Sequence, residues 1–184
     1  MTSDSDAPEQ IVWQGNFITA KKRGRWEYAG RARGIRAAAI VAVDEDEAGR
    51  HVLLVEQYRV PLSRFCLEIP AGLIGDEDGG EDEAAEDAAR RELEEETGYR
   101  AARMELVGEF YSSPGMVSES FSLMRATGLE KVSEGGGVSD EDIVVHRVPL
   151  ARLDAFVAKK RADGVAIDVR IAMLLAGGGH ILGD

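Results

Sequence analysis

The segment from Glu83 to Gly98, EAAEDAARRELEEETG, constrains the fold more than any other part of the sequence. Its composition is that of a helix, which we expect to begin near Asp82 or Glu83. Gly98 can enter the left-handed region and is expected to end the helix. At about 100° per residue, one sector carries both small apolar and acidic side chains: Ala85, Ala88, Ala89, Glu92, Glu95 and Glu96.

This arrangement places like charges where a helix tolerates them poorly. Carboxylates at positions i and i+4 repel one another, and Glu94, Glu95 and Glu96 lie at the end where the helix macrodipole already disfavours negative charge. A hard divalent cation would convert this repulsion into shared coordination, and oxygen ligands on a partly enclosed face suit Mg²⁺ or Mn²⁺. The competing interpretation is an acidic helix face that is simply exposed to solvent.

The composition limits the kinds of partner and site. The chain has 184 residues, enough for one domain with a substantial core, and its formal net charge of −12 argues against binding to nucleic acid. An anionic substrate would therefore need the help of a metal ion. The single cysteine, Cys66, excludes an internal disulfide and a multi-cysteine zinc site, and we expect it in the core.

The sequence also predicts where the protein is found. No apolar run approaches the length of about 20 residues that a membrane span requires. The first ten residues, MTSDSDAPEQ, are acidic rather than basic, unlike the start of a signal peptide. We therefore expect a cytoplasmic protein that does not interact with membranes.

The remaining segments predict a mixed α/β domain. We expect residues 1–10 to be disordered, 11–35 to form a β-rich segment and 36–184 to form the main domain. Strand-like runs bounded by turn signals cover residues 11–19, 25–34, 37–43, 51–60, 65–73, 102–113, 119–129 and 143–150. Apolar residues spaced three and four apart predict two more helices, over 151–162 and 168–178. This order predicts a layered α/β sandwich of mixed β-sheets.

Residues 83–98 resemble the signature of the Nudix hydrolases, G-x5-E-x7-R-E-U-x-E-E-x-G-U, where U is apolar. The positions that match in register are Glu83, Arg91, Glu92, Leu93, Glu95, Glu96 and Gly98, with Tyr99 in the last position. The resemblance implies the Nudix α/β/α sandwich with its catalytic loop and helix, preceded here by an N-terminal β-rich extension. It also implies that Glu92, Glu95 and Glu96 bind metal and take part in catalysis.

The match departs from the signature in front of the helix. Gly72 lies eleven residues before Glu83 instead of six, so five residues are inserted. Because loop entropy grows slowly with length, the turn-like insertion can bulge into solvent without moving the helix. In related enzymes the backbone carbonyl at the position of Ala71 helps to bind metal. The inserted loop does not match a calcium-binding EF-hand, because Gly80 and Glu81 stand where an acid or amide and then a glycine are required.

Beyond the signature, residues 25–175 look like the ADP-ribose pyrophosphatase branch, also called ADP-sugar diphosphatases. The stretches that carry this likeness are RWEYAGR, EQYRVPLSRFCLEIPAGL, FYSSPGMVSESF and the acidic loop before IVVHRVPL. Alignment of VVHRVP places Glu141 where relatives have an acidic residue for metal binding or water activation. Asp140 and Asp142 are the alternatives for this general base.

Other residues are assigned supporting or substrate-binding roles. Arg91 precedes Glu95 by four residues and can hold that carboxylate in place. Glu83 is expected to support the loop or the helix start rather than metal. By resemblance, Trp26 offers an aromatic face to an adenine ring, and a turn at Pro114 and Gly115 brings part of the site toward the sugar. The expected substrate contacts are Trp26, Glu27, Arg31, Arg59, Met116 and Glu119.

The resemblance favours an Mg²⁺-dependent hydrolase, with Mn²⁺ as the other possible ion, that cleaves ADP-ribose or a similar nucleoside diphosphate sugar into a nucleoside monophosphate and a sugar phosphate. In relatives the N-terminal strands cross to a partner subunit, so we expect a homodimer. Two alternatives stay open. The substrate could be a UDP- or GDP-sugar, a dinucleoside polyphosphate or NADH, or the chain could be a silent nucleotide-binding Nudix module.

Overall fold

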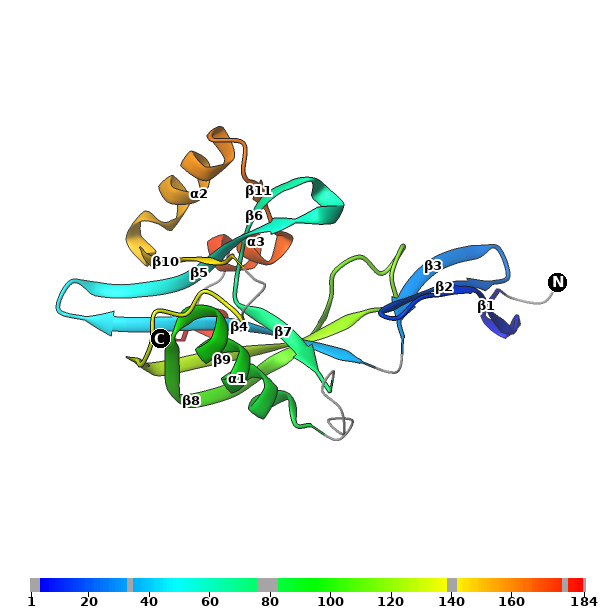
Figure 1. The fold of residues 1–184 in the computed structure, drawn as a ribbon, viewed down its shortest axis with the longest axis horizontal. Helices are drawn as coiled ribbons and strands as arrows, with labels where there is room; N and C mark the ends of the chain where they lie inside the picture. The colour runs from blue at the N-terminus through cyan, green and yellow to red at the C-terminus, as the bar shows by residue number, and fades with distance from the viewer. Residues whose placement is uncertain (1–3, 33–34, 76–82, 139–141, 177–178, 184) are drawn as a thin grey trace.

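The computed structural model describes residues 4–32, 35–75, 83–138, 142–176 and 179–183. A small antiparallel sheet at the N-terminus stands to one side of the main body (Figure 1). It consists of β1 (Glu9–Gln14), β2 (Ile18–Arg23) and β3 (Trp26–Arg31), preceded by the short helix η1 (Asp4–Asp6). The segment 11–19, predicted as one strand-like run, is divided by a turn in which the Gly15 N–H donates to the Ile18 carbonyl.

Strand β1 begins within the segment that we expected to be disordered. The Glu9 carboxylate accepts a hydrogen bond from the Tyr28 hydroxyl at 2.6 Å and pairs with Lys21 at 3.0 Å. Because both partners come from neighbouring strands, these contacts extend the order of the small sheet to residue 9. The composition of the first ten residues does not show such pairing.

The main body contains a mixed sheet. Its strand order is β11-β6-β5-β4-β9-β8, with β10 paired to β5 and β7 paired to β4. Strands β4 and β9 are parallel, as are β11 and β6, whereas the other pairs are antiparallel. The strands are β4 (Arg36–Asp46), β5 (Gly49–Arg59), β6 (Arg64–Glu68), β7 (Ala71–Ile74), β8 (Tyr99–Tyr111), β9 (Ser120–Lys131), β10 (Val144–Pro149) and β11 (Ala166–Ile167).

Helices cover both faces of this sheet and make the predicted sandwich (Figure 1). Helix α1 (Ala85–Thr97) lies on one face, and α2 (Leu153–Ala162) and α3 (Val169–Ala176) lie on the other. Side chains alternate along a strand, so Ile40 and Ala42 of β4 join the core beneath α1, and Val41 and Val43 join the core beneath α2 and α3. The short elements η2 (Val60–Leu62), η3 (Leu150–Arg152) and α4 (Gly179–Leu182) complete the fold.

Helix α1 differs from its prediction at one end and agrees at the other. It begins at Ala85 rather than near Asp82 or Glu83. Glu83 is used in the loop, where its carboxylate accepts from the Gly75 N–H at 3.0 Å and its carbonyl accepts from Arg36 at 3.2 Å. Gly98 ends the helix with φ of 75° and donates its N–H to the Glu94 carbonyl, as predicted.

Cys66 lies buried in β6, as expected. Burial disfavours the thiolate and raises the pKa of this thiol to about 12. Within the part of the chain that the structure describes, no helix has the length and apolar character to span a membrane.

Candidate active site

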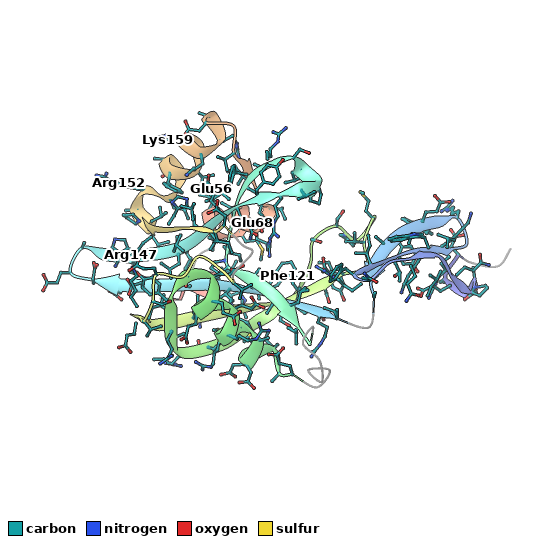
Figure 2. All side chains as sticks on the ribbon, viewed as in Figure 1. Glu56, Glu68, Phe121, Arg147, Arg152 and Lys159 are labelled. Atoms are coloured by element: carbon teal, nitrogen blue, oxygen red, sulfur yellow. The ribbon has the colours of Figure 1, made fainter. Side chains whose placement is uncertain are left out.

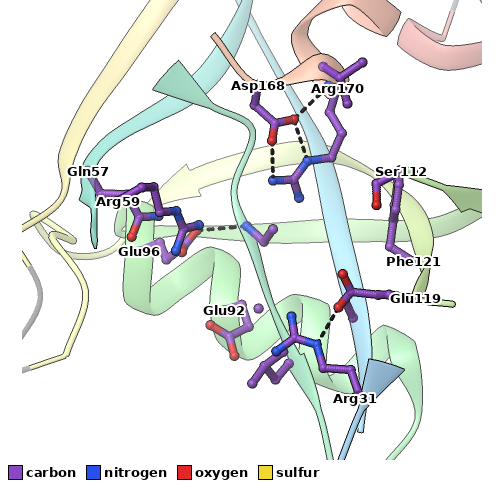
Figure 3. A pocket seen from close by; sticks show the side chains of 15 residues that line it. Arg31, Gln57, Arg59, Glu92, Glu96, Ser112, Glu119, Phe121, Asp168 and Arg170 are labelled. Carbon is purple, nitrogen blue, oxygen red and sulfur yellow. Dashed lines mark hydrogen bonds and ion pairs between the residues drawn. The ribbon is translucent and has the colours of Figure 1, made fainter. Parts of the chain in front are cut away.

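A cavity of about 480 Å³ opens where β7 passes α1 and where β3, β5, β9 and α3 come together (Figure 3). It brings together residues that lie far apart in the sequence, with Glu92 and Glu96 on the α1 side and Asp168 and Arg170 on the opposite side. Its charged lining consists of Arg31, Arg59, Glu92, Glu96, Glu119, Asp168 and Arg170.

The two glutamates of the cavity are held by different neighbours. Glu96 is only 5% exposed, and its Oε2 accepts a hydrogen bond from the Ala71 N–H at 3.0 Å. The Glu92 carboxylate lies against the backbone of Gly72, so closely that a Cβ added there would be 1.8 Å from Cδ of Glu92. The glycine is therefore required for the carboxylate to occupy this position. Despite the insertion that follows it, the strand containing Ala71 and Gly72 packs directly on α1.

Arg91 connects the glutamates of the signature. Its Nη1 donates to Glu92 at 2.9 Å and to Glu95 at 3.4 Å, and its Nε lies 3.6 Å from Glu83. Burial lowers the pKa of Arg91, but the three carboxylates raise it more, so the guanidinium is firmly charged. The ion pair with Glu95 is the one that the i, i+4 spacing predicts.

Two arginines expected to contact substrate line the cavity. Arg31 donates through Nε to Glu119 at 2.5 Å, so both predicted residues lie together although 88 positions separate them. Arg59 forms a two-pronged pair with Glu68, with Nε at 2.6 Å and Nη2 at 2.8 Å from the carboxylate oxygens. Its pKa is raised by the hydrogen bond to Glu68.

The sequence analysis missed Asp168 and Arg170 on the opposite wall, and it missed Glu68, which is not in the lining but pairs with two of the lining arginines. Glu68, labelled in Figure 2, is the last residue of β6. It is buried and also accepts from Arg170 at 3.1 Å. Asp168 accepts from the side chain and the backbone N–H of Arg170, each at 2.7 Å. Two signals could have found them: a charged residue inside the apolar run FCLEIP, and an aspartate at the expected start of a helix, a typical capping position.

Five predicted residues that the structure describes lie outside the lining of this cavity. Arg91 and Glu95 line a separate cavity of about 420 Å³. Trp26 lines another, of about 490 Å³, between the N-terminal sheet and the turn at 114–118. Glu27 lies 3.6 Å from Lys22, and Met116 is 70% exposed. The turn itself is present, since the Met116 N–H donates to the Ser113 carbonyl at 2.9 Å.

The candidate base falls partly outside the described structure. Glu141 and its alternative Asp140 are not among the described residues, whereas Asp142 is described and exposed. Their predicted role therefore stays a prediction.

The carboxylate oxygens in the cavity are of the ligand type that a hard divalent cation takes. Its lining has four carboxylates and three guanidinium groups, a formal charge of −1, so a bound cation would offset negative charge beside a phosphate substrate. In the described parts of the chain, no three acidic, histidine or cysteine side chains are gathered in the arrangement of a metal site. Glu92 and Glu96 instead face Arg91 and the Ala71 N–H, which occupy oxygens that a cation would use.

Comparisons with known proteins show similarity in both sequence and fold. The family model described as NUDIX domain matches residues 34–166. The chain is similar to a GDP-mannose pyrophosphatase of Cronobacter sakazakii, with 34% identity over 151 residues, covering 78% of this chain and 72% of the relative. It is 38% identical over 108 residues to the ADP-ribose pyrophosphatase of Bacillus subtilis, covering 59% of this chain and about half, 54%, of that relative. A crystal structure of ADP compounds hydrolase shares the fold, with a TM-score of 0.66, 22% identity and coverage of 92% and 90%.

Proposed function

The chain belongs to the Nudix hydrolases, and we propose that it hydrolyses the diphosphate bond of ADP-ribose or a related nucleoside diphosphate sugar. Water attacks one phosphorus, and the products are a nucleoside monophosphate and a sugar phosphate. One observation carries this proposal: Glu92 and Glu96 share a cavity with Arg59, so groups for a cation and for a phosphate face the same space. The relative from Bacillus subtilis, by name an ADP-ribose pyrophosphatase, supports this choice of substrate.

We propose Mg²⁺ as the cofactor, with Mn²⁺ as an effective replacement. Glu92 and Glu96 would hold it together with the Ala71 carbonyl, and Glu95 would join from the neighbouring turn of α1. When bound, such a cation neutralises charge on the phosphates and lowers the pKa of a bound water. The negative formal charge of the cavity supports this part of the proposal.

The chain's own residues then have separate tasks. Arg91 keeps the Glu92 and Glu95 carboxylates in place through the contacts at 2.9 and 3.4 Å, and the Ala71 N–H does so for Glu96. Arg59 contacts the diphosphate, because a guanidinium suits phosphate oxygens and Glu68 fixes its direction. Glu141 removes a proton from the attacking water, with Asp140 and Asp142 as alternatives. The resemblance supports this last assignment.

We further propose that the N-terminal segment 11–35 completes the site in a homodimer. In one chain, Trp26 and the cavity of Glu92 are separate. The small sheet also leaves large apolar side chains more than half exposed, namely Ile11, Val12, Trp13 and Phe17. Contact with a second copy would cover these side chains and could bring Trp26 to the partner's cavity. Arg31 and Glu119, already paired in the cavity, would then orient the ribose or sugar. A cytoplasmic location stays a prediction.

A second candidate substrate is a GDP-sugar. The relative from Cronobacter sakazakii is by name a GDP-mannose pyrophosphatase. The match to this chain spans 72% of that relative, compared with 54% of the relative from Bacillus subtilis. The charged residues of the cavity contact metal and phosphate and do not distinguish adenine from guanine. The silent binding module is the least supported candidate, because a pure binder does not require the glutamates that this chain retains.

The test is a panel of ADP-ribose, ADP-glucose, GDP-mannose, UDP-glucose, a dinucleoside polyphosphate and NADH, each assayed with Mg²⁺ for release of a monophosphate. We expect the highest kcat/KM with ADP-ribose or an ADP-sugar. A clear preference for GDP-mannose would change the substrate and keep the enzyme class. Tight binding of ADP-ribose by calorimetry without turnover of any compound would refute the hydrolase.

A further inference from the structure

The end of α1 is capped in an unusual way by a run of glycines that the proposed reaction does not use. The last four carbonyls of a helix have no partner within the helix. Here the Glu94 carbonyl accepts from the Gly98 N–H at 2.9 Å, the Glu95 carbonyl from Gly137 at 3.0 Å and the Glu96 carbonyl from Gly136 at 2.9 Å. Each of the three consecutive glutamates is thus fixed by a glycine N–H, and two of the donors come from a loop about 40 residues further along the chain.

Only glycine suits this loop. Gly135, Gly136 and Gly137 have φ of 66°, 107° and 84°, a region that other residues rarely adopt. A Cβ on Gly135 would lie 2.3 Å from the Thr97 carbonyl carbon, and one on Gly98 would lie 2.2 Å from the Ser133 oxygen. The loop and the helix end therefore approach each other backbone to backbone, with no room for side chains.

The loop is also tied to the chain on both sides of the glycines. The N–H groups of Val132 and Ser133 both donate to the Gly98 carbonyl, at 2.8 and 3.1 Å. After the glycines, the Ile143 N–H donates to the Gly136 carbonyl at 3.3 Å, and Ile143 is buried. The glycines are therefore held against α1 from both directions.

This cap reduces the unfavourable electrostatic energy of the three consecutive glutamates at the end of α1. Three carboxylates lie at the negative end of a helix dipole, which raises the energy of the charged forms. Backbone N–H groups aimed at the same end place partial positive charge there. They also stop the last turn from fraying, which would let the Glu95 and Glu96 side chains swing away from a shared cation.

We propose that the triglycine segment, Gly135 to Gly137, is a positioning element that holds the Glu95 and Glu96 end of α1 in the geometry for binding a divalent cation. The inference rests on the proposed function in that it assumes that these glutamates bind metal. The glycines do not line the main cavity. They act through the backbone carbonyls of the two glutamates.

The test uses two matched variants, Gly136→Ala and Gly49→Ala. Both glycines have φ of 107°, and an added Cβ would meet nothing closer than 3.8 Å at Gly136 and nothing within 4 Å at Gly49. The two substitutions are thus matched in φ and in the space for a Cβ, but Gly49 lies in the β4–β5 hairpin, far along the chain from α1. Mn²⁺ alone is titrated into each full-length protein by calorimetry, and melting temperatures are measured alongside.

We expect both variants to melt at similarly reduced temperatures and only Gly136→Ala to bind Mn²⁺ more weakly, by about tenfold, the loss typical when a group that orients a metal ligand is removed. Equal Mn²⁺ affinity in Gly136→Ala and Gly49→Ala would overturn the inference. If the unmodified protein hydrolyses no diphosphate but Gly136→Ala still loses Mn²⁺ affinity, the proposed function fails and the inference stands.

A second measurement does not depend on any variant. Amide hydrogen exchange of the unmodified protein should show the Gly136 and Gly137 N–H groups protected, and more strongly protected when Mn²⁺ is added. Exchange of both amides at the rate of an unstructured peptide would overturn the inference even if Gly136→Ala failed to fold.

Discussion

Replacing Gly72 by alanine tests whether the position of the Glu92 carboxylate matters for catalysis. The added Cβ would lie 1.8 Å from Glu92 Cδ, whereas ordinary contact begins at 3.4 Å, so one of the two must move by 3.4 − 1.8 = 1.6 Å. The atom in the way is the end of a flexible side chain. Glu92 can therefore turn away at a cost of about 0.5–1.5 kcal/mol, and the fold should survive.

The expected effect on the reaction is much larger than the effect on the fold. A misplacement of about 1 Å at a reacting group can cost about 100-fold in rate, so we expect kcat with ADP-ribose and Mg²⁺ to fall by at least about that factor. The melting temperature should fall by only about 1–6 °C for a chain of this size. Monophosphate release at saturating substrate measures the first quantity, and calorimetry measures the second.

The control is Gly164→Ala, in the turn after α2. Gly164 has φ of 87° with nothing within 4 Å of an added Cβ, so its replacement strains the backbone without touching the cavity. The Gly164→Ala variant should have a lower melting temperature than the unmodified protein and the same kcat. If Gly72→Ala kept its kcat to within about threefold, the carboxylate of Glu92 would not need its observed position, and the reasoning would be refuted.

Three further predictions concern single side chains. Glu96→Gln should lower kcat by about 100-fold or more and change the melting temperature little. Glu94→Gln, at a half-exposed position of the same helix where the side chain pairs with Arg100, should keep its kcat, and equal kcat in both variants would remove Glu96 from the site. Burial raises the pKa of Glu56, but Lys160 and His146 lower it more, so the pKa in the folded protein lies below the unfolded value of 4.5. The ionised Glu56 carboxylate therefore stabilises the folded state above pH 4.5, and this stabilisation is lost as the pH falls through the folded pKa. The difference in urea midpoint between the unmodified protein and Glu56→Gln should therefore shrink as the pH falls from about 6 to about 3, and a constant difference would contradict this. Cys66, with its thiol pKa of about 12, should stay unlabelled by a disulfide reagent at about pH 8 until the protein unfolds, and labelling of the folded protein at the rate of a free thiol would show the burial to be wrong.

The structure explains how α1 tolerates its like charges before any cation is bound. Glu92 pairs with Arg91, and Glu96 accepts from the Ala71 N–H, so the two carboxylates at i and i+4 each have a donor of their own. The same donors hold both side chains at the lining of one cavity. The protein's own donors thus offset part of the repulsion that the sequence predicts.

Features that depend on neighbours in the sequence were predictable. The helix and its end at Gly98 follow from composition and from the backbone freedom of glycine, and the pair of Arg91 with Glu95 follows from one helical turn. The mixed sheet with helices on both faces also follows from the order of strand and helix signals. These predictions succeed because helix and strand periodicities are local properties of the chain.

Features that depend on distant segments could only be decided by the tertiary structure. The periodicity placed Glu92, Glu95 and Glu96 in one sector, yet packing against β7 turns Glu92 and Glu96 into the main cavity and leaves Glu95 in another. Arg170 of α3 pairs with Glu68, which lies 102 positions earlier in the sequence. The two meet because β11, which precedes α3, pairs with β6, which ends at Glu68.

The sequence by itself thus determined the acidic helix, its end and the family to which the chain belongs. The tertiary structure decided which carboxylates share a cavity and which arginines face them. It also decided that the N–H groups of Gly136 and Gly137 cap the Glu96 and Glu95 carbonyls. The physical reason is that side-chain direction along one helix is set by the backbone, whereas the partner of each side chain is set by strand order and by how closely two backbones can approach.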